Sequence, residues 1–145
     1  MVRFVVGVVL AVAVLVGAYV IEGGNPVQLL GFSALLISAL MPLFGVLAIW
    51  KWKDWLRAWR HAFHKSDVAA EVAVSVAVWR FSEFACYLTG LLAWLAGAII
   101  ILNYLSVVEA RWNLALAASV IGPVYGLLFG LVSRILRVRV EELHR

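Results

Sequence analysis

The chain has 145 residues, of which 66% are hydrophobic and only 14% are charged. A soluble domain carries about 25% charged residues, so this composition excludes an ordinary soluble fold and indicates a protein of the lipid bilayer. The net charge of +4 does not indicate nucleic-acid binding, because the basic residues flank apolar runs instead of covering one solvated face.

The first two apolar runs predict transmembrane helices at about residues 4–21 and 29–50. A bilayer core about 30 Å thick requires roughly 20 apolar helical residues, and both runs are long enough. We expect residues 1–17 to be retained as part of the first helix, because the run is too long for a signal-peptide core. The polar sequence EGGNP separates the two runs and predicts a tight outer turn, since Gly and Asn accept positive φ and Pro ends a helix. The motif of this turn comprises Glu22, Gly23, Gly24 and Asn25.

The only long polar stretch, residues 51–83, begins with WKWKDWLRAWRHAFHK. Three tryptophans at helical spacing share one face, and basic residues share another, which is typical of a helix at the membrane interface. These interface residues are Trp52, Trp55, Trp59, Arg57 and Arg60. We interpret the stretch as an interfacial extension of the second helix, with a lipid- or partner-specific basic patch as the alternative.

Two histidines, His61 and His64, follow at a spacing that could place both on one metal ion. Because no third ligand lies nearby, we expect solvated loop histidines and no metal site.

The third span is predicted at about residues 84–106, and its helix is expected to begin in the cytoplasm. Glu71, Ser75 and Ser82 form a narrow polar stripe on an otherwise apolar helix, which therefore has to pack against other helices or copies of itself. The sequence VAVSVAV also alternates like a strand, but an open strand beside a membrane would leave backbone groups unpaired. We therefore predict one helix that continues into the bilayer.

The fourth span is predicted at about residues 113–133, followed by a cytoplasmic tail at 134–145. Glycines four residues apart on this helix, and two glycines seven apart on the third, allow close approach of another backbone within or between subunits. These packing glycines are Gly90, Gly97, Gly122, Gly126 and Gly130. Pro123 removes one intrahelical hydrogen bond, so we expect a kink there.

The distribution of basic residues predicts the orientation of the four helices. Every Lys and Arg except Arg111 lies on the side that holds both termini and the stretch 51–83. Because basic residues remain cytoplasmic, the prediction is an all-α, polytopic membrane protein with both termini inside.

Catalytic chemistry is not expected. No carboxylate, lysine or histidine lies deep within a predicted span, where an ionisable residue would indicate function. The single cysteine, Cys86, cannot form an intramolecular disulfide or a thiolate metal site. Thr89 and Ser119 are the kind of hydroxyl residues that bond to backbone carbonyls, so their default role is structural. We expect no enzyme activity and no cofactor.

Several stretches, taken in order, resemble the MotA/TolQ/ExbB superfamily of ion-driven motor proteins, on the MotA side. VGAYVIEGGNPVQLL resembles the first outer turn of MotA-type subunits, and the segment from FSALLISALMPLFG to WRHAF resembles their second helix with its basic exit. WRFSEFACYLTGLLAWLAGAIIIL matches their two glycines seven apart, and SVIGPVYGLLFGLVSRIL is similar to their fourth helix.

The resemblance implies a bacterial inner-membrane protein that assembles as a ring of five around single-span B-type subunits similar to MotB, TolR or ExbD. Such a partner carries the aspartate that binds H⁺ or Na⁺, which would account for the absence of an acid in these spans. By the same resemblance, helices three and four would line the ring and the first two would face lipid. The candidate pore- or partner-facing residues are Thr89, Trp94, Ser119 and Pro123.

The chain also departs from the MotA pattern. The stretch 51–83 is too short for the large cytoplasmic domain that pushes the rotor. Tyr87 replaces a family proline, Pro123 replaces the threonine expected near the partner aspartate, and Trp94 would narrow an ion path. The alternative is therefore a non-conducting, MotA-like scaffold or assembly factor in an envelope or flagellar complex. An unrelated four-helix protein whose glycines stabilise a dimer is a third hypothesis.

Overall fold

The computed structural model describes residues 6–7, 9–10, 13–14, 32–65, 68–104 and 112–144. The chain divides into two compact units, Met1–Phe32 and Ser33–Arg145. In the first unit, residues 6–7, 9–10 and 13–14 are helical and exposed. The outer turn at 22–25 and most of the first predicted span lie outside the described residues.

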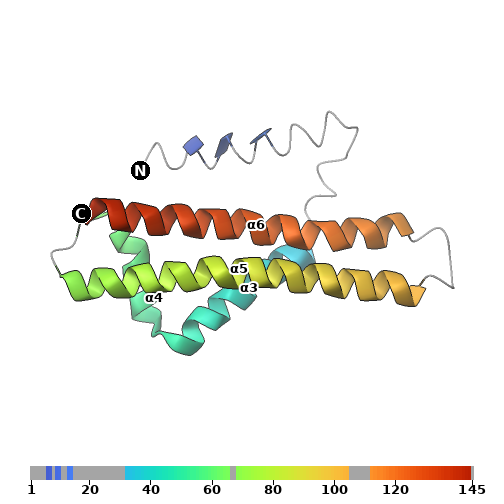
Figure 1. The fold of residues 1–145 in the computed structure, drawn as a ribbon, viewed down its shortest axis with the longest axis horizontal. Helices are drawn as coiled ribbons and strands as arrows, with labels where there is room; N and C mark the ends of the chain where they lie inside the picture. The colour runs from blue at the N-terminus through green and yellow to red at the C-terminus, as the bar shows by residue number, and fades with distance from the viewer. Residues whose placement is uncertain are drawn as a thin grey trace. The chain divides into compact units, whose positions relative to one another are not determined.

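Two long helices dominate the second unit. Helix α5 is formed by Ala69–Tyr104 and helix α6 by Trp112–Leu143. They lie side by side and run in opposite directions (Figure 1). With 36 and 32 residues at 1.5 Å per residue, they are about 54 and 48 Å long, well beyond a hydrocarbon core of about 30 Å. The sequence expected as a tail after residue 133 forms the last turns of α6.

Helices α3 and α4 form a bent pair on one side of α5 (Figure 1). Helix α3 is formed by Phe32–Ile49 and helix α4 by Trp52–His61, and the two are bent by 111°. Lys51 causes the break because its backbone is extended, with φ −70° and ψ 151°. The carbonyl of Lys51 then accepts hydrogen bonds from the amides of Asp54 and Trp55, which begin the new helix. The tryptophan-rich segment is therefore a separate helix and does not extend the preceding one directly.

The described part of the chain contains no strand and is helical apart from short breaks at 50–51, 62–65 and 68 and the final described residue, 144. Residues 72–78, for which a strand was the alternative, form an uninterrupted part of α5. Among the described residues, Ala69–Ile99 and Ser119–Leu143 are long and apolar enough to cross a membrane, and the bent pair adds a third candidate if it forms one span. These helices make the chain a membrane protein by length and composition.

Candidate functional site

Helices α5 and α6 approach each other closely at two glycines. A β-carbon built on Gly126 would lie 2.6 Å from the Cα of Gly90 and 2.8 Å from the carbonyl oxygen of Cys86. Real β-carbons essentially never approach other heavy atoms below 3.0 Å, so any side chain at Gly126 would force the two backbones apart. The absence of a side chain at this position is therefore what allows the observed separation of the helices.

The other packing glycines lie along the same line of contact, which we call the glycine seam. It comprises Gly90, Gly97, Gly122, Gly126 and Gly130 with the residues that face them, Tyr87, Ala93 and Ser119. A β-carbon on Gly97 would lie 2.6 Å from the Cα of Ser119. Gly122 faces the methyl group of Ala93, and Gly130 faces the ring of Tyr87.

The spacing of the seam follows from the two sequences. Gly90 and Gly97 are seven residues apart, and so are their opposite residues Gly126 and Ser119. Seven residues make nearly two helical turns, so the same faces of two antiparallel helices meet again after each heptad. The seam lies within one chain, which answers the question that the sequence leaves open.

The four candidate partner-facing residues do not share one surface. Thr89 and Ser119 are buried, and the hydroxyl of Thr89 donates a 2.7 Å hydrogen bond to the carbonyl of Ala85. Pro123 is partly buried, with its Cα and carbonyl oxygen near Gly90 in the seam. Trp94 is 47% exposed. Only the indole among the four is therefore strongly exposed on this chain.

A charged contact joins α5 and α6 beyond the seam. The guanidinium of Arg137 lies 3.1 Å from Glu83 and 3.9 Å from Glu141. The side chains of Arg137 and Glu83 are only 21% and 12% exposed. Because charges with so little solvent depend on their partners, this pair fixes the register of the helices at the end of the apolar run.

Helix α4 is held on α5 by two tryptophans. The indole N–H of Trp79 donates a 3.2 Å hydrogen bond to the carbonyl of Ala58, and the rings of Trp59 and Trp79 meet edge to face at 4.9 Å. Ala58 is fully buried at this contact. The packing of α4 therefore combines a directed hydrogen bond with aromatic contact.

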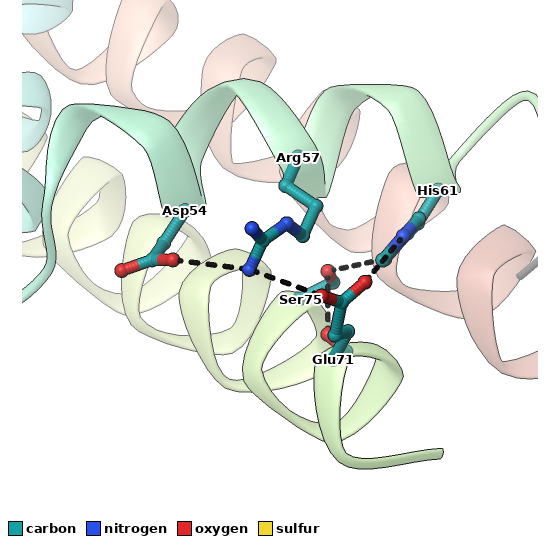
Figure 2. A network of polar contacts seen from close by, with 5 residues as sticks. All are labelled: Asp54, Arg57, His61, Glu71 and Ser75. Carbon is teal, nitrogen blue, oxygen red and sulfur yellow. Dashed lines mark hydrogen bonds and ion pairs between the residues drawn. The ribbon is translucent and has the colours of Figure 1, made fainter. Parts of the chain in front are cut away.

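The last turn of α4 enters a polar network with the first turns of α5, shown in Figure 2. This network, which we call the α4 junction, comprises Asp54, Arg57, His61, Glu71 and Ser75. Arg57 lies between the two carboxylates, 3.5 Å from Asp54 and 3.4 Å from Glu71. Nε2 of His61 lies 3.8 Å from Glu71, and its Nδ1 lies 2.8 Å from the hydroxyl of Ser75.

The hydrogen-bond pattern assigns the proton on His61. The hydroxyl of Ser75 donates to the carbonyl of Glu71 at 2.9 Å, so it accepts from Nδ1–H of the imidazole. The ring of His144, near the end of α6, lies 5.8 Å from the ring of His61. The α4 junction therefore joins side chains of α4 and α5, and His144, the residue after α6, lies beside it.

Burial lowers the pKa of His61 below its ordinary value of 6.5, and the positive charges of His144, Arg57 and Arg60 lower it further. Glu71 acts in the opposite direction, and the net direction is downward. The expectation that both histidines are solvated is therefore wrong for His61, which is 5% exposed, whereas His64 is exposed. The polar stripe of α5 is the feature of the sequence that points to this burial. Ser75 lies on an otherwise apolar helix, and a polar side chain there indicates a polar partner such as His61.

The interface residues of α4 are also divided between two environments. Trp52 is 50% exposed and Arg60 is exposed, whereas Trp55 and Trp59 are partly covered. The indoles of Trp52 and Trp55 lie 4.9 Å apart, and those of Trp55 and Trp59 lie 6.0 Å apart. The tryptophan row thus leads from the exposed side of α4 to its contact with α5.

Within the described ranges, no three His, Cys, Asp or Glu side chains are grouped so that they could hold a metal ion. The side chains of the glycine seam and of the α4 junction serve helix packing and charge pairing.

In comparisons with known proteins, no family model, curated protein or solved structure matches the chain.

Proposed function

We propose that this chain is a MotA-like ring subunit of an ion-gradient-driven membrane complex. It would surround the transmembrane helices of a B-type partner that carries the ion-binding aspartate. The glycine seam is the observation that carries this proposal. It makes α5 and α6 into a close-packed pair long enough to cross the bilayer and extend beyond it, as a wall element of such a ring requires.

The chemistry of the paired helices is consistent with a partner-supplied acid. Residues 84–104 and 112–133 contain no Asp, Glu, Lys, Arg or His. An ion that crosses a membrane needs a polar or charged group in the apolar layer, because an unsolvated charge there is costly. In the proposed complex the partner contributes that group and this chain contributes the surrounding wall.

The proposal includes a location and a topology. The chain would lie in a bacterial inner membrane as a multi-pass protein with four spans and both termini in the cytoplasm. The basic residues of α4 and of the last turns of α6 support this orientation, because positive residues remain on the cytoplasmic side. Five copies would form the ring, and H⁺ or Na⁺ would be the transported ion.

One observation favours a non-conducting scaffold as the second candidate. The hydroxyl of Thr89 bonds to its own helix and is buried, while the exposed position near it carries the indole of Trp94. A buried hydroxyl is not open to an ion path, and an indole offers one donor and no acceptor for a cation. On this hypothesis the same wall holds a partner helix without providing an ion path.

The partner can be sought directly. We would extract the tagged full-length chain from its native membrane in mild detergent and identify associated proteins by mass spectrometry. The motor proposal predicts a stoichiometric single-span protein with one Asp in its apolar helix. A stoichiometric partner that lacks an acid would favour the scaffold, and isolation of the chain alone would contradict both.

Conduction is tested separately, in vesicles that contain the chain and its partner. On the motor proposal, Trp94→Thr with Pro123→Thr widens the path and restores a hydroxyl, so partner-dependent proton leak should increase. A matched variant, Leu91→Thr, changes an exposed α5 residue that is not among the four candidate partner-facing residues and should leave the leak unchanged. An unchanged leak in the double variant would favour the scaffold.

A further inference from the structure

The half of α5 that precedes its apolar run carries a groove that stays open among the described residues. The groove is lined by Ala73, Val76, Ala77, Arg80, Phe81 and Phe84. Ala73, Ala77, Arg80 and Phe84 are exposed along it, and Phe84 is 62% exposed. Its floor is made by small side chains, and Arg80 places one positive charge among them.

Lipid cannot cover this whole groove. The helix is about 54 Å long, and a hydrocarbon core of about 30 Å covers roughly 20 of its residues. If residues 84–104 fill that core, the groove lies at and beyond the membrane boundary. Apolar side chains on a helix outside the bilayer have to be covered by protein. Among the described residues, α4 covers the side of α5 that carries Ser75 and Trp79, and Gly45 of α3 and the adjacent Trp50 contact the ring of Phe81 at one edge of the groove.

The outer side of α6 carries a surface that fits this groove. Leu131, Ile135, Val138 and Glu142 are exposed and spaced four, three and four residues apart, so they form one stripe along the helix. The stripe lies opposite the glycine seam. The stripe ends in the carboxylate of Glu142, whereas the groove holds the guanidinium of Arg80. The two surfaces therefore carry charges of opposite sign.

The two surfaces also lie at the same depth. Within one chain Gly90 faces Gly126, and Glu83 faces Arg137. These two pairs set the register of the antiparallel helices. By this register Val138 of α6 lies at the same height as residues 78–82 of α5, and so at the height of Arg80. Copies in one membrane share their orientation and depth, so the same levels hold between neighbours. Glu142 then lies about one helical turn from Arg80, within reach of the long arginine side chain. Arg134 lies about one turn to the other side but at the edge of the stripe.

We propose that the α5 groove of one copy receives the α6 stripe of the next copy. The inference rests on the homo-oligomer of the proposed function and names the surfaces that build it. Because groove and stripe lie on opposite sides of the α5–α6 pair, the contact is head to tail. A head-to-tail contact generates a closed ring when its rotation closes, and it leaves no uncovered groove in that ring.

Cysteine cross-linking in membranes that contain the full-length chain tests this contact. In a Cys86→Ser background, Ala77→Cys places a thiol in the groove and Val138→Cys places one in the stripe. A mixture of the two single variants should give a cross-linked dimer, neither variant alone should do so, and the doubly substituted chain should give a ladder of multimers. The control Ala96→Cys, also exposed on α5 but about 28 Å further along the helix, should not link to Val138→Cys.

The charge pair provides a second readout. Arg80→Glu should reduce the yield of the mixed cross-link about two- to five-fold, as expected for an exposed ion pair, and Glu142→Arg in the same chain should restore it. Self-linking of either single variant as efficiently as the mixture would overturn the proposal, since copies would then pair through identical surfaces. Absence of the mixed link would overturn it as well.

This result is separable from the motor proposal. A ladder that closes at a number other than five, or an oligomer without a B-type partner, would contradict the motor and leave the groove contact standing. A five-membered complex that lacks the mixed link would contradict the groove contact alone.

Discussion

Gly126 of α6 lies so near Gly90 of α5 that a β-carbon on Gly126 would come within 2.6 Å of the opposite Cα. The atoms in the way belong to the backbone of α5, which cannot rotate aside as a side chain can. The close packing of α5 against α6 therefore depends on the absence of a side chain at Gly126.

Gly126→Ala should destabilise the chain by about 1–3 kcal/mol, because the added methyl group overpacks a rigid contact. Gly45→Ala is the matched control. Its β-carbon would meet only the ring of Phe81 at 3.2 Å, and helical propensity favours Ala over Gly by up to about 1 kcal/mol. Thermal unfolding in detergent should show a lower midpoint for the first variant only. Equal midpoints would refute the close backbone contact.

Trp79→Phe should loosen α4. The substitution keeps an aromatic ring but removes the hydrogen bond to the carbonyl of Ala58, at a cost of about 1 kcal/mol. Amide hydrogen exchange should become faster across α4, whereas Trp52→Phe, at an exposed position, should leave exchange unchanged. Protection that survives Trp79→Phe would mean that α4 is held by something other than this bond.

The pair formed by Glu83 and Arg137 should show strong coupling. Glu83→Gln or Arg137→Gln alone should lower the free energy of unfolding by about 1–3 kcal/mol, because each removes the nearest opposite charge from a little-solvated group. The double variant should lose less than the sum of the two. Arg134→Gln, at an exposed position on α6, should change stability by no more than about 0.5 kcal/mol. Simple additivity in the double-mutant cycle would contradict a direct interaction.

The α4 junction should weaken in acid. The pKa of His61 is lower in the folded chain than in the unfolded chain, so the unfolded chain binds more protons as pH falls below about 6.5. The contribution of His61 to stability is therefore complete above that pH and decreases as pH falls toward the lower, folded pKa. Exchange of α4 amides should accelerate over this range.

Two substitutions isolate this effect. His61→Gln should remove the acceleration, because glutamine does not titrate, while His64→Gln, at an exposed position, should retain it. Acceleration that persists in His61→Gln would assign the pH dependence to another group.

The features that the sequence predicts best are the local and periodic ones. Glycines spaced four and seven residues apart indicate close helix packing whatever the partner, and they do lie in one seam. The run from Ala69 to Tyr104 is helical throughout, in agreement with the expectation of one helix that continues from outside the bilayer. Such features need no knowledge of which residues meet from distant parts of the chain.

The features that sequence reasoning missed depend on distant partners. No Gly or Pro marks the break at Lys51, where the chain turns so that α4 can pack on α5. His61 looked like a loop residue because its partner Ser75 lies 14 residues later, and the ring of His144 lies near the other end of the chain. The division between buried Thr89 and exposed Trp94 likewise depends on how the two helices are rotated about their axes.

The number of copies in the intact complex tests the central claim most directly. We would extract the full-length chain in mild detergent and count its copies by native mass spectrometry, with particle imaging of the same sample. A MotA-like ring subunit predicts five copies around a central hole or around the helices of another protein. A monomer or a dimer would contradict the ring, and the glycine seam would then belong to a close-packed helix pair of a different kind.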